Sequence, residues 1–217
     1  MNNNALLHST GAGILLALVS VLTVNVLLGM EASTLEILAV STSFVCTMWF
    51  VWQLRVAYIM MGITTFLYSL VFFEVDLLAS AALNFVFLMP FAIYGWYVWG
   101  KDGELPVRSL IADWKQDGIP LWLWITPLIW ISLVAFFTAM GGQFTGPDSL
   151  ILLLTVVAQM LMTHKRLESW HVWAIMNVIA IGTYLSAGLY LVTFQYLFFL
   201  GNTIFGWYMW RKSQNVQ

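Results

Sequence analysis

The chain has 217 residues, of which 61% are hydrophobic and 8% are charged, and its formal net charge is −2. Soluble domains carry about 25% charged residues, so the composition excludes an ordinary soluble domain and indicates an integral membrane protein. The small net charge favours no nucleic-acid partner. The single cysteine, Cys46, excludes an intramolecular disulfide.

Long runs without charged residues follow one another along the chain. They cover residues 1–30, 37–54, 56–73, 77–100, 118–147, 149–164 and 169–210. About 20 helical residues cross a hydrocarbon layer of ~30 Å, so the last run holds two spans, with a reversal at Ser186 to Gly188. The sequence therefore predicts eight transmembrane helices. The first run lacks a basic flank and is expected to be a retained helix, not a signal peptide.

The charged residues agree with eight spans. All eight basic residues then fall on one side, which the positive-inside rule makes cytoplasmic, together with both termini: Arg55, Lys101, Arg108, Lys115, Lys165, Arg166, Arg211 and Lys212. Five acidic residues are expected on the outer side: Glu31, Glu36, Glu74, Asp76 and Asp148.

The final third of the chain repeats its middle. The string Gly95-Trp96-Tyr97-Val98-Trp99 returns as Gly206-Trp207-Tyr208-Met209-Trp210. Helices 2–4 therefore correspond to helices 6–8, and the alignment predicts a register shift of five residues in helices 3 and 7. Helix 5 reverses the chain direction, so the two units become parallel repeats, and transporters place substrate sites between such repeats.

This pattern predicts an all-α integral membrane protein of two parallel three-helix bundles. We expect an N-terminal helix in 1–34, the first bundle in 35–100, a cytoplasmic loop and linker helix in 101–147, and the second bundle with a tail in 148–217. A short surface helix is expected near 107–115.

Polar and aromatic residues form stripes on the predicted helices. In helix 7 and in helix 8 the stripe residues each fall within a sector of about 60°, and uncharged amides are costly in lipid, so these faces should point inward. The candidate substrate-binding residues are Tyr68, Asn84, Gln159, Trp173, Asn177, Tyr184, Gln195, Phe199 and Asn202. Such groups suit a flat heterocycle with hydroxyl or amide groups. Alternatively, the amides hold helices together, at about 1 kcal/mol each.

Two helix-breaking residues lie at matching depths. Pro90 in helix 4 corresponds to Gly201 in helix 8, which predicts a hinge at each site. The alternative is a simple kink at Pro90 and close helix packing at Gly201. Trp96, Trp99, Trp207 and Trp210 end their helices beside basic residues and are expected to be interfacial anchors.

The chemistry that the sequence lacks also limits its function. No charged residue falls within a predicted hydrocarbon core, which favours uncoupled transport over proton coupling. An enzyme would need a nucleophile, a metal cluster or an acid–base pair at a cavity, and no such grouping occurs, so we expect no catalytic residue, metal or cofactor. A structural assembly subunit would not require an internal repeat with deep amides. The oligomeric state, including a homo-oligomer, stays open.

Several strings together resemble a known family. These are Leu83-Asn84 through Tyr94 to Trp99, Ala158 to Met162, Glu168 to Trp173, Met176-Asn177-Val178, and Gly201-Asn202 to Trp210. They resemble the Pnu family of bacterial vitamin transporters, whose PnuC-type branch carries nicotinamide riboside, and the likeness covers about residues 35–212.

The resemblance implies a SWEET-like fold and facilitated diffusion by alternating access across the bacterial inner membrane. It also implies that a cytoplasmic kinase phosphorylates the imported nucleoside and so traps it. By motif position, the implied substrate contacts are Gln159, Trp173, Asn177, Gln195 and Asn202. Tyr184 stands where many nicotinamide riboside members have Trp, so thiamine or riboflavin, carried by sister branches, stay as alternatives.

Overall fold

The chain folds into long helices with short connections. A computed structural model describes residues 3–27, 29, 33–74, 78–100, 106–111, 121–141, 145–186, 188 and 190–214. The helices are α1 (Asn3–Leu22) with the π-helical turn η1 (Thr23–Leu27), α2 (Thr34–Val51), α3 (Ala57–Glu74), α4 (Leu78–Ala82) with the π-helical η2 (Leu83–Leu88) and α5 (Met89–Val98), α7 (Leu121–Ala139), α8 (Thr145–Thr163), α9 (Ser169–Ser186) and α10 (Tyr190–Gln214). Since α1–η1 and α4–η2–α5 are each continuous, the described residues form the eight long helices that the sequence predicts.

Five of these helical stretches are both long and apolar enough to cross a membrane. They are Asn4–Leu22, Thr34–Val51, Ala57–Glu74, Ser80–Val98 and Thr145–Thr163, and a shorter apolar stretch covers Ile125–Ala139. Helices α9 and α10 are also long enough to span a membrane, and they carry the polar residues Asn177, Gln195 and Asn202. Their polar side chains are accommodated because α9 and α10 pack against each other and against the rest of the protein.

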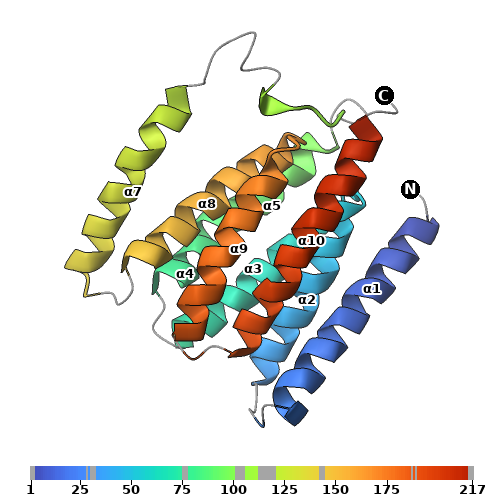
Figure 1. Cartoon of the computed structure of the whole chain (residues 1–217), viewed down its shortest axis with the longest axis horizontal. Coiled ribbons are helices and arrows are strands. Elements are labelled where there is room, and N and C mark those ends of the chain that lie inside the picture. The colour runs from blue at the N-terminus through green and yellow to red at the C-terminus, as the bar shows by residue number, and fades with distance from the viewer. Residues whose placement is uncertain are drawn as a thin grey trace.

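The helices form two three-helix bundles. Helix α3 packs against α2 and α5 in the first bundle, and α9 packs against α8 and α10 in the second. The bundles meet where α10 contacts α2 and where α8 contacts α4 and α5. Helices α1 and α7 lie on opposite flanks, and the two ends of the chain lie at the same end of the molecule (Figure 1).

Corresponding loops in the two bundles have the same backbone feature. Gln53, between α2 and α3, and Lys165, between α8 and α9, both have left-handed backbone angles, with φ of 56° and 50°. Tyr58 and Trp170 follow these residues at equal spacing along the chain. The loops therefore set a register in which Tyr58 corresponds to Trp170.

Each of these two rings lies on the glycine of a repeated string. A Cβ at Gly95 would overlap the ring of Tyr58, and a Cβ at Gly206 would overlap the ring of Trp170. The same contact in both bundles confirms the repeat. The predicted register shift of five residues in helices 3 and 7 is wrong by about one turn, so Asn177 corresponds to Thr65 and not to Met61. Sequence similarity in apolar helices aligns faces well but does not fix which turn matches.

The linker before α7 is joined to the second bundle. The amide N–H of Arg108 donates to the Lys165 carbonyl oxygen (3.1 Å), and that of Leu167 donates to the Arg108 carbonyl oxygen (3.0 Å). Glu168 accepts hydrogen bonds from the Ser109 hydroxyl (2.6 Å) and the Leu110 amide N–H (2.7 Å). A helical turn begins at Leu110, where the short surface helix is predicted; residues 112–115 of that prediction lie outside the described residues.

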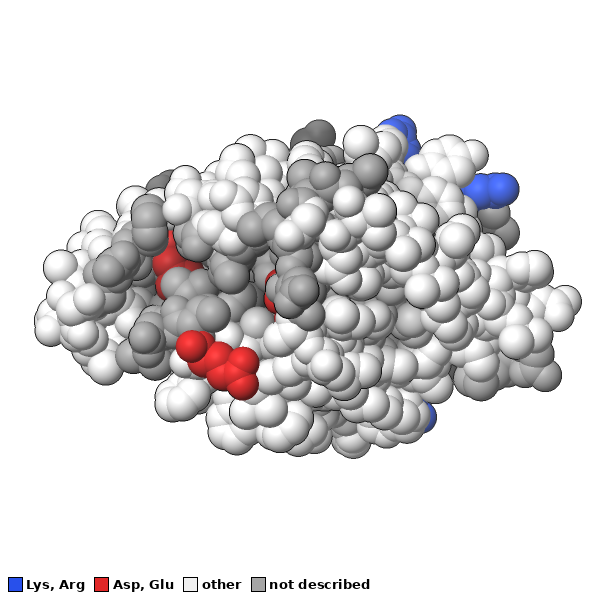
Figure 2. Space-filling model, turned by 90° about the horizontal axis from the view of Figure 1, so that it is seen from below, with Lys and Arg blue, Asp and Glu red and all other residues white. Residues whose placement is uncertain are grey.

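Charges are distributed unevenly along the long helices. Two arginines lie toward one end of the molecule. Arg55 donates to the Trp96 carbonyl oxygen (2.8 Å), and the backbone N–H of Arg108 donates to the Lys165 carbonyl oxygen. Figure 2 shows acidic side chains gathered on one part of the face seen from below, apart from the basic ones. Among the predicted positions, Glu31, Asp76, Lys101 and Lys115 lie outside the described residues. Asp148, which the sequence predicts on the outer side, is buried.

Gly206→Ala should destabilise the protein by about 1–3 kcal/mol, because its Cβ must displace the buried Trp170 ring. Gly201→Ala is the matched control in the same helix, where an added Cβ meets no atom within 4 Å. Thermal melting of the purified proteins should show a lower Tm for Gly206→Ala alone. Equal Tm values for the two variants would contradict this packing.

Glu168→Gln should weaken the linker joint by on the order of 1 kcal/mol, allowing for solvent screening. Burial raises the pKa of Glu168, but hydrogen bonds from Ser109, Leu110 and Ile111 outweigh it and place that pKa below its ordinary value. A lowered folded-state pKa stabilises the fold above the ordinary value of about 4.3, and this contribution is lost as pH falls through the folded-state pKa. The Tm difference between wild type and Glu168→Gln should therefore shrink on acidification below pH ~4; a difference independent of pH would refute the ionic role.

Candidate functional site

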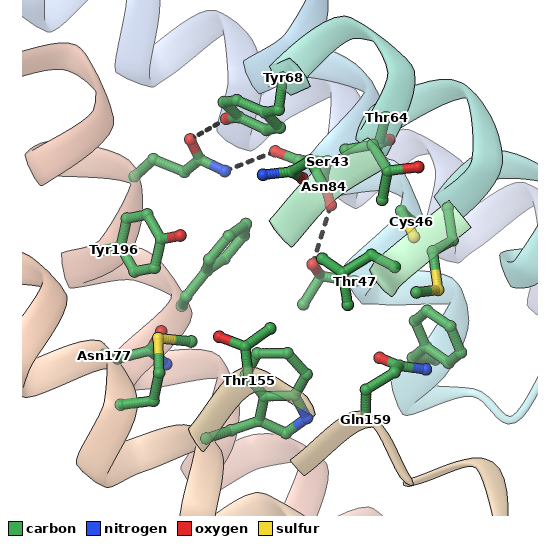
Figure 3. Close-up of a pocket in the computed structure, with 18 of the residues that line it drawn as sticks. Ser43, Cys46, Thr47, Thr64, Tyr68, Asn84, Thr155, Gln159, Asn177 and Tyr196 are labelled. Atoms are coloured by element: carbon green, nitrogen blue, oxygen red, sulfur yellow. Dashed lines mark hydrogen bonds between the residues drawn. The ribbon is translucent and has the colours of Figure 1, made fainter. Parts of the chain in front are cut away.

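A cavity of about 160 Å³ lies between the two bundles. Its walls come from α2, α3 and η2 on one side and from α8, α9 and α10 on the other (Figure 3). The residues lining it include all nine candidates from the sequence: Tyr68, Asn84, Gln159, Trp173, Asn177, Tyr184, Gln195, Phe199 and Asn202. The structure brings together residues from both halves of the chain; their contact with a substrate stays a prediction.

Repeat-related positions face the cavity with different chemistry. In the register set by the two loops, Thr47 of the first bundle corresponds to Gln159 of the second, and Thr65 corresponds to Asn177. All four residues line the cavity. The second bundle therefore carries an amide where the first carries a hydroxyl, so at these positions the longer polar groups come from α8 and α9.

Gln195 takes part in a buried hydrogen-bond network between the bundles. The Tyr68 hydroxyl donates to Gln195 Oε1, and Gln195 Nε2 donates to the Ser43 hydroxyl (2.6 Å). Ser43 in turn donates to the Val40 carbonyl oxygen (2.6 Å). Only 1% of Gln195 is exposed. Both ends of this amide are bound to the first bundle, which is the helix-joining role that the sequence left as an alternative.

Four other candidates carry buried polar atoms for which the described protein supplies no hydrogen-bond partner. These atoms are Gln159 Nε2, Trp173 Nε1, Asn177 Oδ1 and both amide atoms of Asn202. An unsatisfied buried donor or acceptor costs about 1–3 kcal/mol, and such atoms are rare in native proteins. The three helices of the second bundle therefore hold donors and acceptors that suit a polar ligand.

Aromatic rings surround these polar atoms. Trp173 and Phe199 line the cavity, and the Phe199 ring contacts Phe44 and Tyr196 edge-on, with centroids 5.5 and 5.7 Å apart. The Trp173 indole offers both a flat face and its N–H group. Rings beside amides can hold a planar heterocycle while the amides bind its polar substituents.

A layer of five aromatic residues lies at the end of the cavity nearer the basic residues, and two of the five, Phe50 and Trp170, line the cavity. Trp99 packs against Tyr58 (5.1 Å between centroids) and against Trp210 (6.4 Å), and Trp210 packs edge-on against Trp170 (5.4 Å). Phe50 completes the layer, and its carbonyl oxygen accepts a hydrogen bond from Trp210 Nε1 (3.2 Å). This layer brings Trp99 and Trp210, the last residues of the two repeated strings, into contact.

The predicted role as interfacial anchor is therefore wrong for two of the four tryptophans. Trp99 is 8% exposed and Trp210 is fully buried, because both face the partner bundle and not the lipid. Trp96 and Trp207 are only partly buried, and the guanidinium groups of Arg55 and Arg211 lie 3.9 and 4.9 Å from their ring centroids.

A second aromatic group lies at the opposite end of the cavity. Phe72 stacks on Tyr68 and on Tyr184, with centroids 5.4 and 5.9 Å apart, and Tyr184 contacts Tyr196 at 5.2 Å. Tyr184 is 2% exposed. The cavity is thus bounded by ring clusters at both ends, with the amides between them.

The two predicted hinge residues differ in their backbones. Pro90 lies in the first turn of α5, directly after π-helical η2, where the Met89 amide N–H donates to the Asn84 carbonyl oxygen. Proline cannot donate and crowds the preceding turn, so the wider π-turn accommodates it. Gly201 lies within the continuous α10 and has open space beside it, so close packing does not explain this glycine. The hinge role of both residues stays a prediction.

Sequence reasoning missed several lining residues, including Ser43, Thr64 and Tyr196. Ser43 and Thr64 are small hydroxyl residues, which also occur in membrane helices merely bonded to their own backbone. The spacing of Thr64 and Tyr68, one helical turn apart in α3, was an available signal. Tyr196 follows the candidate Gln195 but lies on a different part of the α10 face.

The described lining residues include no Asp, Glu, His, Lys or Arg. The described residues also contain no group of three His, Cys, Asp or Glu side chains that could hold a metal ion. The cavity can therefore bind through neutral hydrogen bonds, ring stacking and cation–π contacts. It offers no described acid–base pair for catalysis.

Comparisons with known proteins agree on one family. Residues 33–212 match the family described as nicotinamide mononucleotide transporter. The nicotinamide riboside transporter PnuC of Escherichia coli strain K12 is 30% identical over 173 residues, covering 68% of this chain and 72% of the relative. The riboflavin/roseoflavin transporter RibM of Streptomyces davaonensis is 23% identical over 129 residues, covering 57% of this chain and 60% of that protein.

A crystal structure of the vitamin B3 transporter PnuC has the same fold. It superposes with a TM-score of 0.79 at 18% identity and covers 96% of this chain and 92% of the solved one. The relatives compared are transporters and not enzymes. The chain is thus a multi-pass membrane protein that belongs to the PnuC-type nicotinamide mononucleotide transporter family.

Proposed function

We propose that the chain carries nicotinamide riboside across the bacterial cytoplasmic membrane. The observation that supports this most is the set of unpartnered polar atoms of Gln159, Trp173, Asn177 and Asn202 beside aromatic rings. Nicotinamide riboside is a flat pyridinium ring with a carboxamide and a hydroxyl-bearing ribose. Its donors and acceptors match those atoms in kind, and its cationic ring gains from contact with an indole face.

The lining favours the riboside over its phosphorylated form, although the family description names the mononucleotide. A phosphate group carries about −1.5 to −2 charges near neutral pH and is bound in proteins by Arg, Lys or clustered N–H groups. The described lining residues include no Lys or Arg. A desolvated phosphate would have no counter-charge there.

Transport by alternating access accounts for the two aromatic closures. The layer at Trp99 and Trp210 joins the two bundles, so a rocking motion of one bundle against the other would open it. The group at Phe72 and Tyr184 would open in the opposite phase, with Pro90 and Gly201 as hinges. The described lining residues include no acidic or basic side chain, which supports uncoupled facilitated diffusion. A kinase in the cytoplasm would then trap the imported nucleoside by phosphorylating it.

The proposed orientation places both termini in the cytoplasm. The basic residues Arg55, Arg108, Lys165 and Arg211 lie at the helix ends that face the same side as the termini, and such residues are retained on the cytoplasmic side. The proposed parts of the chain are the N-terminal helix in 1–34, the first bundle in 35–100, the linker in 101–147 and the second bundle with its tail in 148–217.

Calorimetric titration of purified protein should show micromolar binding of nicotinamide riboside. Asn202→Leu should weaken it at least tenfold, or about 1.4 kcal/mol, because both amide atoms of Asn202 would lose a ligand partner. Asn25→Leu, which removes an exposed amide in the π-helical turn η1, should bind normally. Wild-type protein that ignores nicotinamide riboside but binds thiamine or riboflavin would move the chain to a sister branch, and normal binding by Asn202→Leu would refute the site.

Uptake of labelled nicotinamide riboside, a cation, into liposomes whose membrane potential is held at zero should reach equal internal and external concentrations. An imposed proton or sodium gradient should leave the initial rate and the plateau unchanged, since the described lining holds no ionisable acid or base for coupling. Liposomes that contain Asn202→Leu provide the background rate. Accumulation above the external concentration under either gradient would refute uncoupled transport.

A further inference from the structure

Thr64 is a buried polar residue of the first bundle that the proposed binding residues do not include. It lies in the middle of α3, is 8% exposed and lines the cavity. Figure 3 shows Thr64 and Asn177 on opposite sides of the cavity. The hydroxyl oxygen of Thr64 is buried, and the described protein supplies no hydrogen-bond partner for it.

Other hydroxyl residues of the same helix are bonded to their own backbone, as is common in membrane helices. The Thr65 hydroxyl donates to the Gly62 carbonyl oxygen (3.1 Å). The Ser69 hydroxyl donates to the Phe66 carbonyl oxygen (2.7 Å). A buried hydroxyl without a partner is costly and rare in native proteins. Because Thr64 lines the cavity and lacks a bond within the described protein, the contents of the cavity are the natural source of its partner.

The repeat shows that Thr64 adds a polar group on the side where such groups are few. In the register set by the two loops, Thr64 corresponds to Met176, which also lines the cavity. Methionine offers only a weak acceptor, so at this position the stronger polar group belongs to the first bundle. Among the residues that the structure describes, the other buried side-chain atoms without a partner all belong to the second bundle.

We propose that Thr64 is a further substrate-binding residue: its hydroxyl bonds a hydroxyl or carboxamide group of the ligand from the first bundle, while Asn177 and Asn202 bind from the second. This inference rests on the proposed transport function and adds the contact through which the ligand bridges the two bundles. A ligand bonded to both walls favours the arrangement in which the walls face each other, because it binds that arrangement more tightly than one in which they are apart.

The test replaces the hydroxyl of Thr64 by a methyl group in a side chain of the same shape. In calorimetric titration, Thr64→Val should bind nicotinamide riboside at least fivefold more weakly than wild type, or about 1 kcal/mol. Thr64→Ser keeps the hydroxyl and should stay within twofold of wild type. Without ligand, the Tm of Thr64→Val should equal or exceed that of wild type, because the substitution removes a buried hydroxyl that has no partner.

Thr183→Val is the matched control in the second bundle. Thr183 of α9 is also 8% exposed, but its hydroxyl donates to the Ile179 carbonyl oxygen (3.0 Å). It is not among the described residues that line the cavity. This variant should bind nicotinamide riboside within twofold of wild type, and its Tm without ligand should not rise.

Affinity and stability together decide the inference. Normal binding by Thr64→Val overturns it, and so does an equal loss of affinity in Thr183→Val. A ligand-free Tm of Thr64→Val below that of wild type also overturns it, because the hydroxyl would then have a structural partner. If wild type binds thiamine or riboflavin instead of nicotinamide riboside, the proposed substrate is wrong, and titration of the same variants with that vitamin decides the role of Thr64 separately. Wild-type protein that binds none of the three overturns the proposed function and this inference with it.

Discussion

Amide side chains in helices surrounded by lipid must be turned inward, because an unsatisfied polar group in hydrocarbon costs several kcal/mol. This constraint places the amides of Asn177, Gln195 and Asn202 between the two repeated bundles, in a layer of polar side chains that we call the polar seam. Gln195 is satisfied there by Tyr68 and Ser43 and so joins the bundles. Asn177 and Asn202 keep unpartnered atoms in the same seam. One constraint therefore yields both the cohesion of the protein and the polar chemistry of its cavity.

The repeat supplies the tryptophan layer at one end of that cavity. Gly95 and Gly206 have no side chain, so the rings of Tyr58 and Trp170 can lie against their helices, and this leaves Trp99 and Trp210 facing the partner bundle. A substitution that fills either glycine would displace a ring from the layer that joins the two halves. Packing at the glycines and closure of the cavity thus depend on the same contacts, although the glycines do not line the cavity.

Much of the architecture could be predicted because hydrophobic length and charge placement act locally. Eight helices, two repeats and the cavity positions of residues such as Asn177 and Gln195 follow from periodicity and from the cost of amides in lipid. Other features depend on contacts between distant segments. The backbone of Gln53 and Lys165 sets the register, partner bundles bury Trp99 and Trp210, and Ser80 holds Asp148 inside the protein. Hydropathy and residue type do not distinguish these two loops from ordinary turns, the buried tryptophans from interfacial anchors, or the buried Asp148 from an acidic residue at the surface.

The central claim is that the amides of the seam are divided between a joining role and a binding role. Nuclear magnetic resonance of the side-chain amide groups, labelled with nitrogen-15 and assigned by substitution, tests this division most directly. On addition of nicotinamide riboside, the signals of Gln159 and Asn202 should shift strongly, whereas the signal of Gln195, bonded to Tyr68 and Ser43, should stay nearly unchanged. A strong shift of Gln195 with unchanged Gln159 and Asn202 signals would contradict the account.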